Sequence, residues 1–284
     1  MRGWLAAGTT NAVHHSAVLS VVIPTFDTAA MTLRCVRAVE ADEVIVVDDG
    51  STDGTAELLA PFARVVRMPI NSGFAVAANR GVAEARGDII LLLNSDAVVQ
   101  PGALSALVAA FADQRLGIAG AQLLNEDGTP QWSGGPTPTL PWLIGVVSGL
   151  GPLVGRFRRR RAGGPVDWVS GAAMAFRAAV WRDAGPLDER FRFYCQDLEL
   201  CVRARAAGWN VRVVPEARVV HARGATVAAG STLQHDPAKL WPDLLDWARA
   251  GSFTRALLLL AGALRALVTR DPDVRRAVRA MRRS

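Results

Sequence analysis

Cysteines and aromatic residues are scarce in this chain. Its 284 residues include three cysteines, Cys35, Cys195 and Cys201. Their odd number and wide spacing argue against a disulfide framework and favour a reducing compartment. Aromatic residues amount to 6%, and neither a zinc-finger cysteine pattern nor an RNP-type run is present, so nucleic acid is not an expected partner.

Long apolar runs are missing as well. The first 18 residues lack the apolar centre of a signal peptide, and no stretch reaches the roughly 18 uninterrupted apolar residues of a transmembrane helix. Hydrophobic residues nevertheless make up 50% and charged residues 20%, which predicts a packed core. We expect a flexible N-terminal extension over residues 1–18, one domain over 19–230 and a basic, amphipathic helical tail over 231–284.

Short aliphatic and β-branched runs alternate with helical patterns in the first third of the chain. Four such runs predict buried strands, at 19–24, 43–48, 64–68 and 88–94. This alternation predicts an α/β fold with a mostly parallel sheet and helices on both faces. The second half is less regular, and its patterns predict a strand at 167–177, a helix at 194–207 and two short strands at 211–215 and 217–221.

Polar residues follow three of the predicted strands where each strand ends. They are Pro24 and Thr25, Asp48 and Asp49, and the run Asn94, Ser95 and Asp96. Ligands of parallel sheets bind beyond the carboxyl ends of the strands, so these residues converge on one predicted crevice. Asp96 suits a divalent cation that bridges a carboxylate and substrate phosphates. Asp48 and Asp49 fit either a nucleoside site or the acidic start of a helix.

Asp197 is either a candidate general base or an acidic residue that stabilises the start of a helix. It begins a predicted helix after Phe191, Phe193 and Tyr194, and an apolar surrounding raises the pKa of a carboxyl group toward the range of a base. Glu199 lies two positions further on and faces elsewhere, so one of these two carboxylates is structural. His221 ends a predicted strand and is either a metal ligand or a structural histidine.

Seven motifs in a fixed order resemble glycosyltransferase family 2, which has the GT-A fold, and in particular its bacterial rhamnosyltransferase-like branch. They span residues 19–226 and read SVVIPTF, VIVVDDGSTDGT, NSGFAVAANRG, IILLLNSDAVV, VSGAAMAFR, DERFRFYCQDLELCVRARAAGW and VVHARGAT. The resemblance implies a GT-A nucleotide-binding sheet as the catalytic domain over 19–230.

The resemblance also implies roles for individual residues. Asp197 matches the catalytic base, although the family's usual Glu-Asp reads Gln-Asp here. Asp96 matches the last residue of the metal-binding Asp-x-Asp motif, whose first position is Asn94, and His221 matches a position that completes the metal site for Mg²⁺ or Mn²⁺. The implied donor-binding residues are Pro24, Thr25, Asp49, Asn71, Gly73, Asn94 and Ser95, and the implied acceptor region is Trp168, Ser170 and Gly171.

The implied reaction is inverting transfer of a sugar, by branch L-rhamnose, from a dTDP- or UDP-sugar to a cell-envelope glycan or a polyprenyl-linked acceptor. Two other functions compete with it. A nucleotidyltransferase needs a glycine-rich loop with a basic residue after the first strand, and this chain has none there. A non-catalytic relative that binds a nucleotide sugar or scaffolds a membrane does not need both Asp96 and Asp197.

Basic and apolar residues combine in two segments. The net charge is +6, which favours an anionic partner. An apolar stretch at 140–155 leads into arginines at 156–161, and the tail carries leucines at helical spacing with many arginines. This pattern predicts either a helix in the lipid interface or an amphipathic helix packed on the domain. The first reading places the protein peripherally at the cytoplasmic face of the plasma membrane.

Overall fold

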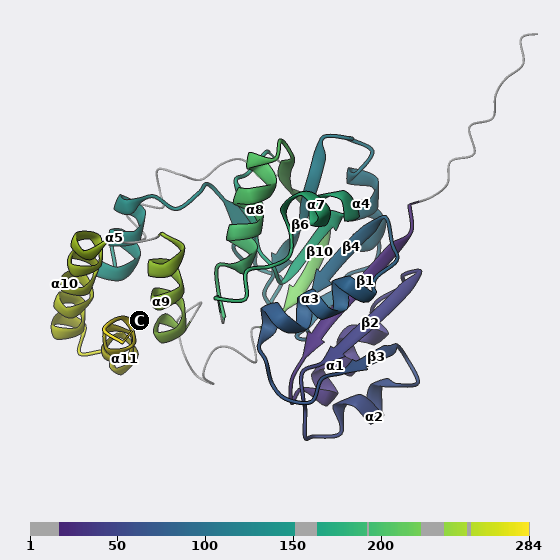
Figure 1. Ribbon diagram of the computed structural model, residues 1–284, viewed down its shortest axis with the longest axis horizontal. Coiled ribbons are helices and arrows are strands. Elements are labelled where there is room, and N and C mark those ends of the chain that lie inside the picture. The colour runs from purple at the N-terminus through teal and green to yellow at the C-terminus, as the bar shows by residue number, and fades with distance from the viewer. Residues whose placement is uncertain (1–16, 151–163, 192, 223–235, 249–250, 284) are drawn as a thin grey trace, which may run out of the picture.

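The computed structural model describes residues 17–150, 164–191, 193–222, 236–248 and 251–283. Nearly all of the predicted N-terminal extension, the arginines at 156–161 and the start of the predicted tail lie outside these residues. The chain forms a sheet domain flanked by helices, with a separate block of helices beside it (Figure 1).

Eight strands form the main sheet, in the order β3-β2-β1-β4-β9-β6-β10-β5. Strands β1, β2, β3 and β4 run parallel, as predicted. A short antiparallel ribbon, β7 with β8, lies apart from this sheet. The strand bounds are β1 Leu19–Thr25, β2 Glu43–Asp48, β3 Arg64–Arg67, β4 Ile89–Leu93, β5 Ala97–Val99, β6 Leu116–Leu124, β7 Gly134–Gly135, β8 Trp168–Val169, β9 Ala173–Arg177 and β10 Asn210–His221.

Two strand predictions in the second half were wrong in detail. The segment 167–177 holds two strands, β8 and β9, because the chain turns at 170–172 and leaves the ribbon for the main sheet. The two strands predicted at 211–215 and 217–221 are one strand, β10, which passes Pro215 through a shift in register against β6. A bulge of this kind lets a strand continue past a proline that cannot donate to the ladder.

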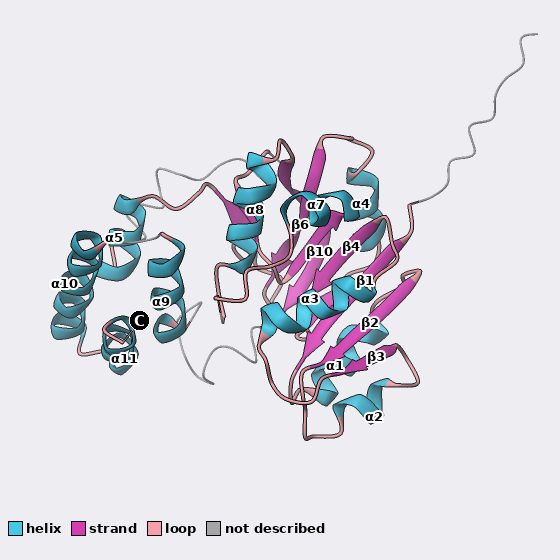
Figure 2. Cartoon of the chain, in the orientation of Figure 1, coloured by secondary structure: helices cyan, strands magenta, loops and turns pink. Residues whose placement is uncertain are grey.

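Helices cover both faces of the sheet, as predicted (Figure 2). Helices α1, α2 and α4 share one apolar core with Val21 and Ile23 of β1, and α3, α7 and α8 share a second with Val22 of the same strand. Gly81 lets α3 lie close to the sheet, since a Cβ there would come within 2.3 Å of Val22. The bounds are α1 Ala29–Arg37, α2 Thr55–Leu59, α3 Phe74–Glu84, α4 Ala103–Ala110, α7 Ala178–Ala184 and α8 Gln196–Ala206.

The helical block comprises α5 (Leu140–Ser148), α9 (Pro237–Trp247), α10 (Ser252–Thr269) and α11 (Pro272–Met281). These helices enclose a third apolar core that also includes Phe191 and Leu198 of the sheet domain. The helical block therefore shares a core with the sheet domain, close to the start of α8.

Candidate active site

A cavity of about 420 Å³ opens at the carboxyl ends of β1, β2 and β4. The predicted residues of the strand ends and the predicted base line the same cavity. Of the thirteen positions named as site residues, the lining includes Pro24, Thr25, Asp49, Asn71, Gly73, Asn94, Ser95, Trp168, Ser170, Gly171 and Asp197. Asp96 and His221 lie next to Asn94 but are not among the lining residues.

Asp49 fixes one end of the cavity. Its carboxylate accepts hydrogen bonds from the amides of Ser72, at 2.9 Å, and Gly73, at 2.8 Å. Burial raises the pKa of Asp49, these two amides lower it, and the charge of Asp48 raises it. Gly73 has φ of 96°, a conformation that favours glycine. Asp49 therefore holds the loop 71–73 against β2 and shapes the wall at Asn71.

Asp197 lies in the first turn of α8 and faces the same cavity. Its Oδ2 accepts from the Gly171 amide at 2.7 Å, and its Oδ1 accepts from the Leu198 amide at 2.8 Å. Gly171 leaves room for this carboxylate, because a Cβ there would lie 3.3 Å from the Asp197 Cβ. Cys195, two residues before Asp197, has φ of 71°. This is a strained conformation that is common next to functional groups.

Burial raises the pKa of Asp197, and the amides of Gly171 and Leu198 lower it. The net shift is upward. A carboxylate that is partly desolvated and fixed by two amides can accept a proton more readily than an exposed one, and its position does not depend on the solvent. The arrangement suits a general base in the cavity.

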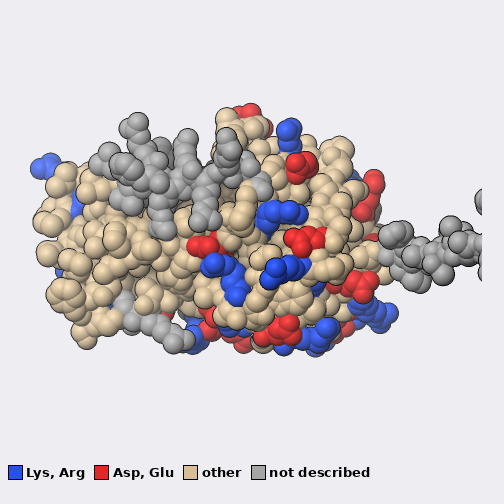
Figure 3. Space-filling view, turned by 90° about the horizontal axis from the view of Figure 1, so that it is seen from above, with Lys and Arg blue, Asp and Glu red and all other residues tan. Residues whose placement is uncertain are grey.

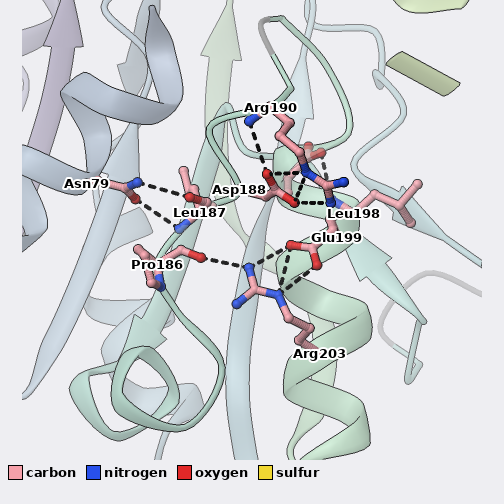
Figure 4. A network of polar contacts seen from close by, with 9 residues as sticks. Asn79, Pro186, Leu187, Asp188, Arg190, Leu198, Glu199 and Arg203 are labelled. Atoms are coloured by element: carbon pink, nitrogen blue, oxygen red, sulfur yellow. Dashed lines mark hydrogen bonds and ion pairs between the residues drawn. The ribbon is translucent and has the colours of Figure 1, made fainter. Parts of the chain in front are cut away.

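Glu199 has a structural role. Either Asp197 or Glu199 was expected to have such a role. Both of its oxygens bond to Arg203, which also donates to the Pro186 carbonyl (Figure 4). Asn79 on α3 exchanges two hydrogen bonds with the backbone of Leu187, at 3.0 and 2.9 Å. The segment 186–191 is thereby tied to α3 and to α8, and α8 is held in place at the cavity.

The side chains of Asp96 and His221 lie close together beside Asn94. The Asp96 Oδ1 lies 3.3 Å from His221 Nε2. The amide nitrogen of Gln131 donates to the carbonyls of His221, at 2.6 Å, and Leu124, at 3.1 Å, so its Oε1 faces His221 Nδ1, at 3.1 Å. Nδ1 then carries the proton, and the lone pair of Nε2 points toward Asp96.

This pair fits a divalent cation that takes its other ligands from a substrate. A carboxylate and an imidazole whose second nitrogen is hydrogen-bonded are normal ligands. Among the described residues, no group of three or more His, Cys, Asp and Glu side chains could hold a metal ion. A cation held by this pair would take its remaining ligands from water and a bound molecule.

Sequence reasoning missed several residues of the site. Trp132 and Trp142 line the cavity beside Trp168, yet they lie in segments with little periodicity. Gln131 orients His221. Asp243, in α9, accepts at Oδ2 from the amides of Phe193, at 3.1 Å, and Tyr194, at 2.8 Å. A carboxylate in the middle of an amphipathic helix gives no sign in the sequence that it orders a loop elsewhere.

A family model described as "Glycosyl transferase family 2" matches residues 20–181. The chain is 29% identical over 275 residues to N-acetylglucosaminyl-diphospho-decaprenol L-rhamnosyltransferase of Mycobacterium tuberculosis, with 84% of this chain and 88% of that protein covered. It is 28% identical over 243 residues to the O-antigen biosynthesis protein RfbC of Myxococcus xanthus, with 77% of this chain and 18% of that protein covered.

Solved structures with a similar fold are glycosyltransferases. The mannosyltransferase PcManGT of Pyrobaculum calidifontis, in complex with GDP-Man and Mn²⁺, superposes with a TM-score of 0.55 at 18% identity, covering 94% of this chain and 86% of that one. GalNAc-T7, with UDP, GalNAc and Mn²⁺, gives a TM-score of 0.58 at 19% identity, with 74% and 44% covered. The sheet domain therefore has the GT-A fold.

We predict that Asp243→Ala loosens the loop that leads to Asp197. The part-buried amides of Phe193 and Tyr194 lose their charged acceptor, which lowers the free energy of unfolding by about 1–3 kcal/mol. Their hydrogen exchange, measured by NMR, becomes faster. Asp246→Ala is the matched control, since Asp246 lies on the same helix but is exposed and pairs with Arg255, at 3.5 Å. Equal exchange rates in both variants would contradict this role.

Proposed function

Because the chain belongs to glycosyl transferase family 2, and is thus a glycosyltransferase, we propose that it transfers a sugar from a nucleoside diphosphate to an acceptor hydroxyl with inversion at the anomeric carbon. One observation carries this proposal. The cavity joins Asp49, Asn94 and Asp197, so a donor that spans the strand ends has its anomeric carbon within the reach of a base. A single base facing one open cavity suits a single displacement.

Each end of the cavity has a role in the proposed reaction. The nucleoside lies along Thr25, Asp49 and the loop 71–73. Asp197 takes the proton of the acceptor hydroxyl, whose oxygen forms the new bond to the anomeric carbon while the bond to the diphosphate breaks. The Gly171 amide keeps Asp197 oriented through this step. Positioning of both substrates supplies much of the rate enhancement.

We also propose that Asp96 and His221 hold a divalent metal at the donor diphosphate. Such an ion neutralises the negative charge that develops on the leaving diphosphate. Because His221 offers a nitrogen ligand and Mg²⁺ prefers oxygen, the pair favours Mn²⁺ over Mg²⁺. Gln131 keeps the Nε2 of His221 available as a ligand.

The donor and acceptor follow from the rhamnosyltransferase that the chain is similar to over most of its length. We propose a dTDP- or UDP-sugar, with L-rhamnose as the sugar, and an acceptor sugar linked through a diphosphate to a polyprenyl lipid. The three cysteines are unpaired, which fits the reducing, cytoplasmic side of the membrane.

A lipid-linked acceptor is consistent with an apolar outer surface on α10. Phe253, Leu260, Leu264 and Leu267 lie along one side of this helix and are 82%, 58%, 55% and 73% exposed. Figure 3 shows that the helical block, at its left, carries far less charge on the visible face than the sheet domain. By length and composition α10 is the one described helix that could cross a membrane, and 17% of it is buried.

The charged side chains of α10 do not lie on this apolar surface. Its two charged residues are arginines: Arg255 pairs with Asp246 of α9 at 3.5 Å, and Arg265 donates to the Val146 carbonyl of α5 at 3.0 Å. Exposed arginines lie before, within and just after α11, at 270, 275, 279 and 282. An uncharged helix face next to exposed arginines suits the interface of an anionic bilayer. We propose that residues 236–283 dock the catalytic domain, 19–230, on such a surface.

Asp197→Asn is expected to abolish transfer. Loss of a general base lowers kcat by about 10²–10⁴, while UDP or dTDP binding, measured by calorimetry, stays near normal because Asp49 is untouched. Glu199→Gln, on the same helix but bonded to Arg203, is the control and stays active. In the wild type the acidic limb of the pH profile lies above the range of an ordinary aspartate, about 3.9, because activity falls as pH falls through the raised pKa of Asp197. An active Asp197→Asn enzyme would refute the assignment.

Asp96→Ala is expected to make nucleotide binding insensitive to Mn²⁺. In the wild type, EDTA weakens UDP or dTDP binding, and Mn²⁺ restores it more effectively than Mg²⁺. The variant binds the nucleotide as weakly as the wild type in EDTA. Asp127→Asn, in the exposed turn where Asp127 bonds to Thr129, serves as the control. If Asp96→Ala keeps the full response to Mn²⁺, the ion binds elsewhere.

Replacing Leu260, Leu264 and Leu267 by serine is expected to release the protein from liposomes that contain phosphatidylglycerol. At about 1 kcal/mol for each side chain, the partition constant falls roughly a hundredfold. The matched control is the triple serine variant of Leu58, Phe62 and Ile70, which are exposed on the sheet domain. If the variant of Leu260, Leu264 and Leu267 still sediments with liposomes, and is a monomer where the wild type is a dimer, the surface is a subunit interface.

A further inference from the structure

Three tryptophans form one wall of the cavity. The ring centroids of Trp132 and Trp168 are 4.9 Å apart at an interplanar angle of 79°, and those of Trp132 and Trp142 are 5.8 Å apart at 44°. They come from the loop after β6, from α5 and from β8. Trp132 is 42% exposed although it lies between the other two, so part of its ring faces the cavity that all three line.

Trp168 is fixed before any ligand binds. Trp168 pairs with Gly135 in the β7–β8 ribbon, and its indole nitrogen donates to the Pro136 carbonyl at 3.1 Å. Gly135 leaves space for the neighbouring ring, because a Cβ there would lie 3.2 Å from Trp132 Nε1. Rings held in this way lose little conformational freedom when a ligand stacks on them.

The three tryptophans lie beside Asp197. Several strands of the sheet separate them from the end of the cavity at Asp49. The Ser170 amide donates to the Ser133 carbonyl at 3.0 Å, and the next amide, of Gly171, donates to Asp197. Ser133 directly follows Trp132. The strand order β2-β1-β4-β9-β6 places Asp49 after β2, Asn94 after β4 and the wall after β6. A donor that starts at Asp49 therefore reaches Asp197 before it reaches the tryptophans.

The lining chemistry indicates a neutral ligand. Among the described residues that line the cavity, none is a lysine or an arginine, so apart from the metal proposed for the donor, nothing there compensates a second diphosphate. The indole of Trp168 already uses its N–H. Indole faces are apolar and carry the negative side of the ring quadrupole, and the C–H groups on one face of a pyranose ring complement them. Ser170 and Gln196 offer polar atoms at the edge of the same wall.

We propose that Trp132, Trp142 and Trp168 form the subsite for the sugar ring of the acceptor, which stacks against Trp132 and presents its hydroxyl to Asp197. This inference rests on the proposed function. It assigns only the acceptor's sugar ring to the wall.

The test is an NMR titration of the protein, labelled with ¹⁵N in its indole groups, with methyl N-acetylglucosaminide in the presence of diamagnetic Mg²⁺ and UDP or dTDP. The indole signals of Trp132 and Trp142 are expected to shift. Trp132→Ala is expected to weaken sugar binding about tenfold, corresponding to about 1.4 kcal/mol, with Trp132→Phe close to the wild type and nucleotide affinity unchanged. Trp209→Ala, which removes an indole bonded to Asp183, is the control.

Failure of this inference and failure of the proposed function give different experimental results. The inference is overturned if the sugar does not bind, if it binds without moving those two indole signals, or if Trp132→Ala weakens nucleotide binding instead. The proposed function is tested separately by nucleotide release from the donor in the wild type. A protein that releases nucleotide but fails the indole titration keeps its function and loses this subsite.

Discussion

The hydrogen bond from the Gly171 amide to Asp197 joins the two sides of the cavity. It depends on the direction of β9, which runs antiparallel between β4 and β6. The pairing of Leu93 with Ala173 places the start of β9 beside the end of β4, and the Asn94 amide donates to the Ala172 carbonyl at 3.0 Å. If β9 ran parallel to β4, the turn at 170–172 would lie at the opposite edge of the sheet, far from the donor residues.

The helical block contributes to the site as well as to the proposed membrane surface. Asp243 of α9 holds the loop before Asp197, and Tyr194 accepts at its hydroxyl from the Asp236 amide at 3.3 Å. Trp142 of α5 belongs to the aromatic wall. The same helices that expose an apolar face on α10 thus support the base and the acceptor side of the cavity. Docking on lipid and presentation of a lipid-linked acceptor then involve one structural unit.

The sequence predicted the first half of the fold well, because parallel strands with both faces covered leave clear aliphatic runs such as 43–48 and 88–94. It also predicted which polar residues meet, since the carboxyl ends of parallel strands share one edge. It did not predict the reversal of β9, because a five-residue strand buried on both faces has the same pattern in either direction. Only the position of Arg203 shows that, of Asp197 and Glu199, it is Glu199 that has the structural role.

Of the tryptophan wall, the sequence indicated only Trp168, through the family resemblance; the assembly of the wall and the support of His221 were beyond sequence reasoning for a related reason. Trp132, Trp142 and Trp168 lie in loops, a short helix and a two-residue strand, where no periodicity indicates a shared face. Gln131 acts on a histidine ninety positions away, and such a contact follows only from the register of β10 against β6. These residues are set by long-range packing, whereas the strand-end residues are set by local pattern.

The most direct test is a crystal structure of the protein with Mn²⁺ and a nucleoside diphosphate, in which the anomalous signal of the metal is located. We expect the metal at Asp96 and His221, the nucleoside along Asp49, and the β-phosphate on the side of the cavity that faces Asp197. A nucleotide bound outside this cavity, or a metal held by other side chains, would contradict the central claim that one cavity serves the donor and the base.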